Sequence, residues 1–237
     1  MNLGAMEAAL AEVVADSRLA LSFTQKLNDT ILELAGDFEL PALVLLDPAP
    51  LTVDSSKWLW PMPDSFHKKL FRVANSSVTP WGHVHIHRDI EYLTRRDMAH
   101  TTTGDHVTGV ATAMQGVGWV LGVHPLPLAE EILQLWYYRK PAILAKPADV
   151  PDCIPPEYHY RAIVVKTVLK NFRLFTDAIE DGPMKSVAYW EGLYRKGLYG
   201  EPGGDIGLIN YIAKLRGGPR RTGGRDPVGS RPFHYGV

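Results

Sequence analysis

The sequence of 237 residues contains one cysteine, Cys153, which excludes an intrachain disulfide and is typical of a protein made in a reducing compartment. It also lacks an excess of either charge, with 25 Lys and Arg residues against 26 Asp and Glu residues. This balance argues against a general nucleic-acid-binding or membrane-surface protein.

Long hydrophobic segments are missing as well. The longest uninterrupted apolar run, residues 40–46 with their proline, is too short to span a membrane. Residues 1–19 form an acidic, alanine-rich amphipath and not a secretion signal. We therefore expect a soluble protein made in the cytoplasm.

The signatures of hydrolases and nucleotide-binding enzymes are also absent. The sequence has no Gly-x-Ser-x-Gly, His-Glu-x-x-His or Gly-x-x-x-x-Gly-Lys motif. Gly116 and Gly118 lie between two expected strands and predict a hairpin turn, not a nucleotide loop. Cys153 lies among prolines, so we expect a half-buried structural residue and not a nucleophile. Glu130 and Glu131 are interpreted as solvated turn residues. We predict no enzyme, no catalytic residues and no cofactor.

Helical periodicity marks the first 40 residues. Apolar residues three and four apart predict a short helix over residues 6–14. Ser22 followed by Gln25 predicts a capping box at the start of a second helix. Asn28 and Asp29 fall off the apolar stripe of that helix, so we expect them to be solvated or at a subunit contact. The stripe itself is Phe23, Leu27, Ile31, Leu34 and Phe38.

From residue 41 to residue 151 the pattern changes to short strands separated by Pro, Gly, Asn and Ser. No long helical segment separates them, which favours an antiparallel sandwich or small barrel. Residues 89–98 are interpreted as a helical turn inside it. The expected strands are Lys57–Trp60, Lys69–Ala74, Trp81–His87, His106–Ala113, Gly118–Val123 and Ile132–Tyr138.

The segment 131–161 leads from the last expected strand back into helices. Pro155 and Pro156 preset the backbone of a first turn, and Glu157 places a carboxylate near the positive end of its dipole. Apolar stripes then predict helices over residues 162–179, 184–199 and 206–215. The aromatic residues expected in the core or at a subunit contact of the second of these helices are Tyr189, Trp190 and Tyr194.

The two sets of helices flank the strands and need partners for their apolar stripes. We therefore predict an α+β fold. Residues 1–40 and 152–216 form one helical bundle, residues 41–151 form an inserted antiparallel β domain, and residues 217–237 form an extended arm.

The arm is rich in glycine, proline and arginine and cannot bury enough surface to fold alone. Its arginines could hold the phosphates of a nucleic acid. Alternatively, they could pair with carboxylates of a protein while aromatic residues fill a pocket. A solvated tail is the third interpretation. The residues expected to make a contact are Arg220, Arg221, Arg225, Arg231, Phe233, His234 and Tyr235.

Three histidines form the sharpest candidate for a metal site. His83, His85 and His87 alternate along the expected strand Trp81–His87, which places the imidazoles on one face, roughly 7 Å apart along the strand. Three imidazoles could bind zinc and leave a fourth position open. A zinc site also needs groups that orient its ligands. We therefore prefer a histidine-rich exposed or interfacial face and predict no metal.

Several motifs together resemble the head-to-tail adaptor (tail accessory) proteins of short-tailed bacteriophages. The similarity covers most of residues 20–200. It includes the strand ending in Leu135-Trp-Tyr-Tyr-Arg-Lys-Pro, the loop with Asp149-Val-Pro, and the helix start Ile154-Pro-Pro-Glu-Tyr-His. The remaining motifs are Leu27-Asn-Asp, Trp58-Leu-Trp-Pro-Met-Pro-Asp-Ser-Phe, Arg72-Val and Tyr189-Trp.

The resemblance implies a structural virion protein at the head–tail junction, assembled in the host bacterial cytoplasm. Copies would form a ring that matches the twelvefold portal, and genomic DNA would pass through its channel without sequence-specific binding. The arm Gly217–Val237 would run along the portal protein, which favours a protein partner for it. Helices 23–38 and 162–179 would form the ring wall, and the β domain would face the tail or nozzle protein. The alternatives are a nucleic-acid-binding module that uses the arm and a zinc-dependent enzyme that uses the three histidines.

Overall fold

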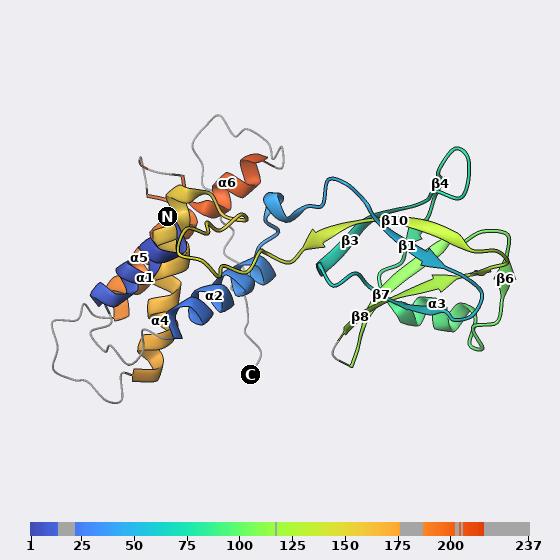
Figure 1. The fold of residues 1–237 in the computed structure, drawn as a ribbon, viewed down its shortest axis with the longest axis horizontal. Coiled ribbons are helices and arrows are strands. Elements are labelled where there is room, and N and C mark those ends of the chain that lie inside the picture. Colours follow the sequence, from blue (N-terminus) through green and yellow to red (C-terminus); the bar gives the residue numbers. More distant parts are fainter. Residues whose placement is uncertain (14–21, 117, 176–186, 202–203, 205, 216–237) are drawn as a thin grey trace.

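The computed structural model describes residues 1–13, 22–116, 118–175, 187–201, 204 and 206–215. The fold is α+β, with most helices gathered at one end of the molecule and the strands at the other (Figure 1). The helices of the first part are α1 (Leu3–Val13), α2 (Phe23–Asp37), α4 (Val165–Phe175), α5 (Val187–Tyr199) and α6 (Leu208–Leu215). A short helix, α3 (Ile90–Arg96), lies among the strands.

Helix α2 buries the stripe that its sequence predicts, because Phe23, Leu27 and Ile31 are at most 3% exposed. The predicted capping box is wrong. Ser22 occupies the N-cap position, but its side chain makes no capping hydrogen bond. Its backbone is already near the helical region, at φ −104° and ψ −2°, whereas a capping residue adopts an extended backbone.

The second helical segment begins where the prolines predict. A 3₁₀ turn over Pro156–Tyr158 leads into a π-helical turn over His159–Val164 and then into α4. Helix α5 packs closely against the π-helical turn at Gly197. A Cβ atom at Gly197 would lie 2.5 Å from the Cβ of Arg161, so any larger residue would push these two elements apart.

One hydrophobic core joins the helices from both ends of the chain. Leu3, Leu34, Val165 and Leu208 all belong to it, although they lie on α1, α2, α4 and α6. Polar contacts reinforce it, since Thr167 donates a hydrogen bond to Thr30 at 2.9 Å in a fully buried position.

A charged contact also ties α2 to α4. The Nζ atom of Lys166 lies 3.0 Å from carboxylate oxygens of both Glu33 and Asp37, and Lys170 also bonds Glu33. Burial alone would raise the pKa of Glu33, but the ammonium groups of Lys170 and Lys166 hold it below its usual value.

The strands form two four-stranded sheets and one two-stranded pair, and no sheet of the described residues closes into a barrel. The sheet orders are β1-β10-β3-β4, β2-β8-β7-β5 and β6-β9. Most pairs are antiparallel, as expected, but β5–β7 and β6–β9 are parallel. The strands are β1 (Ala49–Val53), β2 (Leu59–Pro61), β3 (Phe66–Asn75), β4 (Gly82–His83), β5 (His85–Ile86), β6 (Thr103–Gly104), β7 (Gly109–Gln115), β8 (Gly118–His124), β9 (Leu126–Pro127) and β10 (Glu131–Arg139).

Strand β10 shows why its sheet has an inner and an outer face. Leu133, Leu135 and Tyr137 are fully buried in a second hydrophobic core, which also contains residues of β3, β7 and β8. Ile132 and Trp136 alternate with them and point the other way. As predicted, β7 and β8 form an antiparallel hairpin, and Gly116 in its turn has φ +60°.

Strand β1 is not among the strands expected from the sequence, and it contains proline, Pro50, a residue that disfavours strands. It nevertheless pairs with β10 at the edge of its sheet. An edge strand has a neighbour on one side only, so it tolerates proline where the missing N–H group would face solvent. The expected strand Trp81–His87 is wrong as one unit. The chain pairs with β3 at His83 and then joins the other sheet at His85, beside β7.

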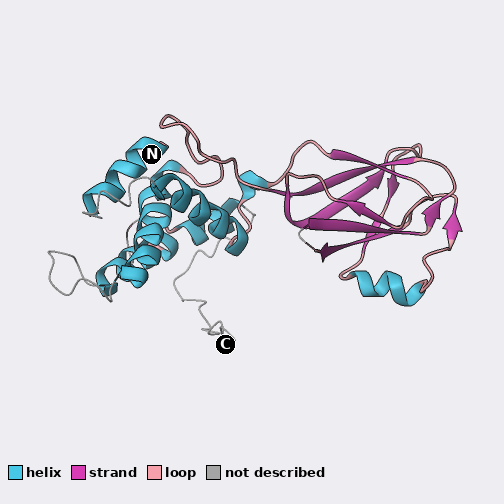
Figure 2. Cartoon of the chain, turned by 60° about the horizontal axis from the view of Figure 1, so that its bottom comes forward, coloured by secondary structure: helices cyan, strands magenta, loops and turns pink. Residues whose placement is uncertain are grey.

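Two chain segments connect the helices to the strands (Figure 2). Polar bonds brace this joint. Lys68 on β3 donates hydrogen bonds of 2.7 and 2.8 Å to the carbonyl oxygens of Gly36 and Phe38, at the C-terminal end of α2. An ion pair of 2.6 Å links Arg139 to Asp152 on the second segment.

Candidate functional site

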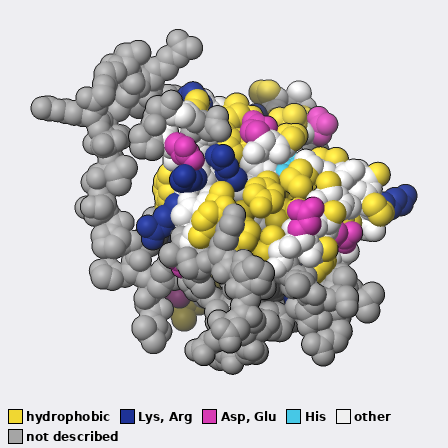
Figure 3. Space-filling model, turned by 90° about the vertical axis from the view of Figure 1, so that its left-hand side faces the viewer, with side chains coloured by type: hydrophobic (Ala, Val, Ile, Leu, Met, Phe, Trp, Pro, Cys, Tyr) yellow, Lys and Arg dark blue, Asp and Glu magenta, His cyan; other side chains and the backbone are white. Residues whose placement is uncertain are grey.

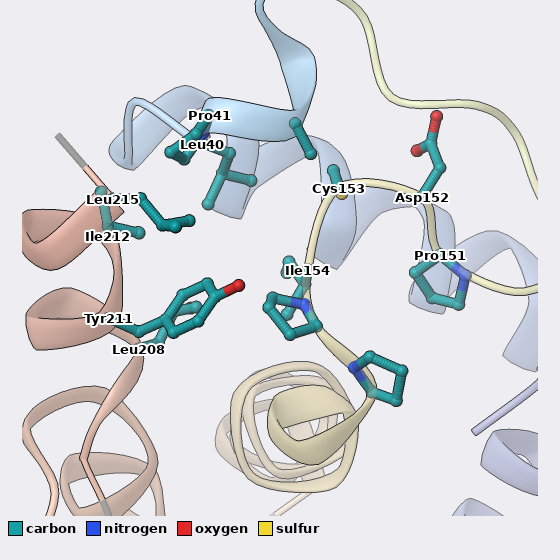
Figure 4. Close-up of a pocket in the computed structure, with 13 residues that line it drawn as sticks. Leu40, Pro41, Pro151, Asp152, Cys153, Ile154, Leu208, Tyr211, Ile212 and Leu215 are labelled. Atoms are coloured by element: carbon teal, nitrogen blue, oxygen red, sulfur yellow. The ribbon is translucent and has the colours of Figure 1, made fainter.

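An apolar cleft lies where α6 meets the loop that leads into the second helical segment (Figure 4). Leu208, Tyr211 and Ile212 of α6 form one wall, and Cys153 and Ile154 lie across from them. The cleft has a volume of about 320 Å³. Leu215 at its rim is 56% exposed, so the end of α6 offers an apolar contact to a partner.

Cys153 is unsuited to catalysis, in agreement with the sequence. Its side chain is 3% exposed, which makes it more deeply buried than the expected half-buried position. Burial raises the pKa of the thiol to about 12. The reactive thiolate is therefore scarcely formed at neutral pH.

The three candidate zinc ligands are not brought together as one row. His83 pairs with β3 in one sheet, whereas His85 pairs with β7 in the other. The rings of His85 and His87 do touch, with centroids 4.5 Å apart, and His87 stacks on Tyr92 at 4.2 Å. Within the described ranges, no three His, Cys, Asp or Glu side chains are placed to hold a metal ion.

The histidines near α3 share an environment that disfavours their charged form. Burial lowers the pKa of His87, and the neighbouring positive charges of His85 and Arg96 lower it further. Burial and Arg96 lower the pKa of His124 in the same way. At neutral pH these rings are packing groups and not cations.

Asn28, a predicted subunit contact, makes a reciprocal pair with Leu144 in its own chain. Its Oδ1 accepts from the Leu144 amide at 2.8 Å, and its Nδ2 donates to the Leu144 carbonyl at 2.9 Å. It thereby fixes the loop after β10 against α2. Asp29 next to it is exposed. A contact of either residue with another subunit stays a prediction.

The aromatic residues of α5 divide between the core and the surface. Trp190 is 6% exposed and belongs to the helical core, whereas Tyr189 is 42% exposed and Tyr194 is half-buried. Hydrophobic side chains lie among acidic and basic ones at this end of the molecule (Figure 3). Of the three, Tyr189 is the best placed for a subunit contact. The seven arm residues from Arg220 to Tyr235 lie outside the described residues.

Sequence reasoning missed one exposed cluster on the strands. The indole rings of Trp81 and Trp136 have centroids 6.5 Å apart, and the guanidinium of Arg72 lies 4.5 Å over the Trp136 ring. The alternation of β10 could have placed Trp136 on an outer face. Its contacts with Arg72 and Trp81 depend on strand register, which the sequence does not reveal.

These surfaces define a class of protein. A cleft with apolar walls and exposed aromatic residues beside an arginine are features of protein–protein contact sites. The braced joint would hold such surfaces at a set distance. These features favour a structural, protein-binding protein. No helix within the described residues is both long and apolar enough to cross a membrane.

The chain belongs to the SU10 adaptor protein family, a phage head-to-tail adaptor family whose model matches residues 1–207. This confirms the family expected from the sequence. The protein is thus a phage structural adaptor, and its family implies a place at the head–tail junction of the virion. No curated protein matches the sequence.

Proposed function

We propose that copies of this chain form a ring beneath the portal of a phage and join the DNA-filled head to the tail. The observation that carries the proposal is the family match, which spans residues 1–207 and so includes both the helices and the strands. Two hydrophobic cores connected by a braced joint suit a connector, because each part can face a different partner.

The ring has twelve copies in this proposal, to match the portal, and the helices α2 and α4 form its wall. Tyr189 and Asp29, both exposed, lie at contacts between subunits. Genomic DNA passes through the channel without sequence-specific binding. The near-balance of 25 basic and 26 acidic residues is compatible with such passage, since a strongly basic lining would hold the DNA.

The arm, residues 217–237, docks on the portal protein. Its four arginines pair with carboxylates, while Phe233 and Tyr235 act as anchors in apolar pockets. The arm follows α6 directly in the sequence, so the cleft beside α6 lies close to where it begins. The β region faces the tail or nozzle protein. The ring assembles in the cytoplasm of the host and remains in the virion.

Native mass spectrometry of the full chain with its purified portal ring tests this function. We expect a ring of adaptor subunits on the portal, and loss of that complex when residues 217–237 are deleted. A second variant replaces only Phe233 and Tyr235 with alanine. It should weaken docking to the portal although the charge of the arm is unchanged, which separates the aromatic anchors from the arginines.

Two results would contradict the proposal. One is a wild-type chain that does not bind the portal ring. The other is a chain that binds duplex DNA through the arm, with an affinity that falls steeply with salt, because that behaviour belongs to the nucleic-acid alternative.

A further inference from the structure

We propose that the outer face of the β1-β10-β3-β4 sheet is a docking surface for a protein segment that presents a carboxylate beside an apolar side chain. We call it the Trp81–Trp136 surface; its central residues are Trp81, Trp136 and Arg72. The inference rests on the proposed function, because a connector that holds the portal at one end needs a second contact surface for the tail.

Strand pairing places these side chains on one face. Arg72 on β3 is the register partner of Trp136 on β10. His83 on β4 pairs with Ala74, two residues further along β3 and therefore on the same face. Trp81 immediately precedes β4, and its ring lies 6.5 Å from that of Trp136. The surface thus spans three neighbouring strands.

The surface is apolar at positions where solvent reaches it. Trp81 is 54% exposed. Ile132, which lies four residues before Trp136 on the same face of β10, is 40% exposed. Trp136 itself is half-buried beneath the guanidinium of Arg72. Tryptophan and arginine are the residues most enriched among those that dominate the binding free energy of protein interfaces.

The charge of the surface selects the partner. No acidic residue occupies an outward position of these strands, and within the described residues no carboxylate pairs with Arg72. The guanidinium of Arg72 lies over the Trp136 ring, and a guanidinium can bind a carboxylate through two parallel hydrogen bonds. The outward residues are Pro50, Thr52, Arg72, Ala74, His83, Ile132, Gln134 and Trp136.

A protein segment fits this chemistry better than single-stranded nucleic acid does. Stacking on tryptophan would serve either ligand. However, nucleic-acid binding draws its affinity from several phosphate contacts, whereas this face offers the one permanent cation of Arg72. One cation among apolar side chains matches one carboxylate among apolar side chains.

The test titrates the full chain with three probes and follows tryptophan fluorescence and backbone amide NMR shifts. The probes are a peptide of alternating glutamate and leucine, its glutamine–leucine counterpart, and oligothymidylate. We expect the glutamate peptide to bind at least about tenfold more tightly than the glutamine peptide, because a hydrogen bond between two charged groups is stronger than one to a neutral amide. Shifts should concentrate in β3, β4 and β10.

Three variants make the test specific. Trp81→Ala and Arg72→Gln should each weaken binding of the glutamate peptide by about tenfold or more, in line with their place at the centre of the surface. Met98→Ala is the control, because Met98 is 84% exposed outside this surface and should have no effect. Thermal unfolding of each variant shows whether it remains folded, and Arg72→Lys provides a milder change at the same position.

Equal binding of the two peptides, or unchanged binding by Trp81→Ala and Arg72→Gln, would overturn the inference. Tighter binding of oligothymidylate would replace it with a nucleic-acid surface. The portal experiment separates this result from the proposed function. Both variants should still assemble on the portal, and only tail attachment to the assembled ring should fail. If the wild-type chain did not bind the portal but still bound the glutamate peptide more tightly than the glutamine peptide, the proposed function alone would fail.

Discussion

The helical and β parts of this molecule are assembled in opposite ways. The β core draws its buried residues from one stretch of chain between Val53 and Tyr137. The helical core draws on both sides of that stretch, from Leu3 to Leu43 and again from Tyr138 to Ile212. The β part can therefore bury its core from contiguous sequence, whereas the helical part needs segments far apart in the chain to meet.

The contacts inside the two parts also differ in kind. Helices α2 and α4 are held together by Lys166, Glu33 and Asp37, which lie far apart in the sequence. The β core instead contains an aromatic group in which Phe66 contacts Tyr137 and Trp119, with ring centroids 5.2 and 5.4 Å away. The two parts should therefore respond differently to substitutions, even though the joint connects them.

The largest expected effect comes from matched cavities in the two cores. Leu27→Ala in α2 and Leu135→Ala in β10 each remove a side chain that is 0% exposed. Each should lower the free energy of unfolding by about 2–5 kcal/mol. Amide hydrogen exchange should show that each substitution weakens protection mainly in its own part. Equal loss of protection throughout would mean that the two cores unfold as one unit.

A smaller effect is expected for the charged contact between α2 and α4. Lys166→Met keeps much of the buried stem but removes the ammonium group between Glu33 and Asp37. The carboxylates are partly exposed and can rehydrate, so we expect a loss of about 1–2 kcal/mol in denaturant unfolding. Arg95→Ala, which breaks an exposed pair with Glu91 on α3, is the control and should change nothing measurable. No loss from Lys166→Met would show that the contact is dispensable.

The joint can be weakened without touching either core. Lys68→Ala removes both hydrogen bonds to the end of α2 and should cost about 1–2 kcal/mol, since a cation there also interacts favourably with the negative end of the helix dipole. Spin-label distances between α4 and β8 should broaden as the two parts reorient. Lys69→Ala breaks only the exposed pair with Glu39 and serves as the control. Unchanged distances for Lys68→Ala would place the rigidity of the joint elsewhere.

Acidification should distinguish the two parts by their histidines. Burial lowers the pKa of His87 and His124 in the β part, of His67 at its joint with α2, and of His159 in the helical core, all from the ordinary value of 6.5. A lowered folded-state pKa means that the unfolded chain binds more protons, so stability is lost as pH falls below 6.5 toward those lowered values. Three of the four lie in or beside the β part. Hydrogen exchange at pH of about 7.5 and about 5.5 should therefore show the greater loss of protection there. A greater loss in the helices would contradict this assignment.

The smallest effect is a chemical one. Cys153, with its pKa raised to about 12 by burial, should react with a thiol reagent only when the cleft beside α6 opens. Labelling of the native chain at pH of about 8 should be slow, and Leu27→Ala should accelerate it more than Leu135→Ala does. Rapid labelling of the wild-type chain would show that the cleft opens readily.

The sequence by itself determined the elements with strong periodicity and the family. The stripe Phe23–Leu34, the proline-led start after Ile154 and the hairpin turn at Gly116 are all where their patterns predict. Such features depend on residues within a few positions of one another, so the sequence contains the whole signal. The family resemblance likewise rests on local motifs, and the match over residues 1–207 confirms it.

Only the tertiary structure decided which distant segments meet. It brings Asn28 to Leu144, separates His83 from His85 into two sheets, adds β1 at an edge despite Pro50, and places Arg72 over the Trp136 ring. Each of these depends on strand register or on packing between segments far apart in the chain. Local periodicity reports which face of an element is buried. It does not report which partner covers that face, because that choice is made by the combined free energy of all the segments that pack together.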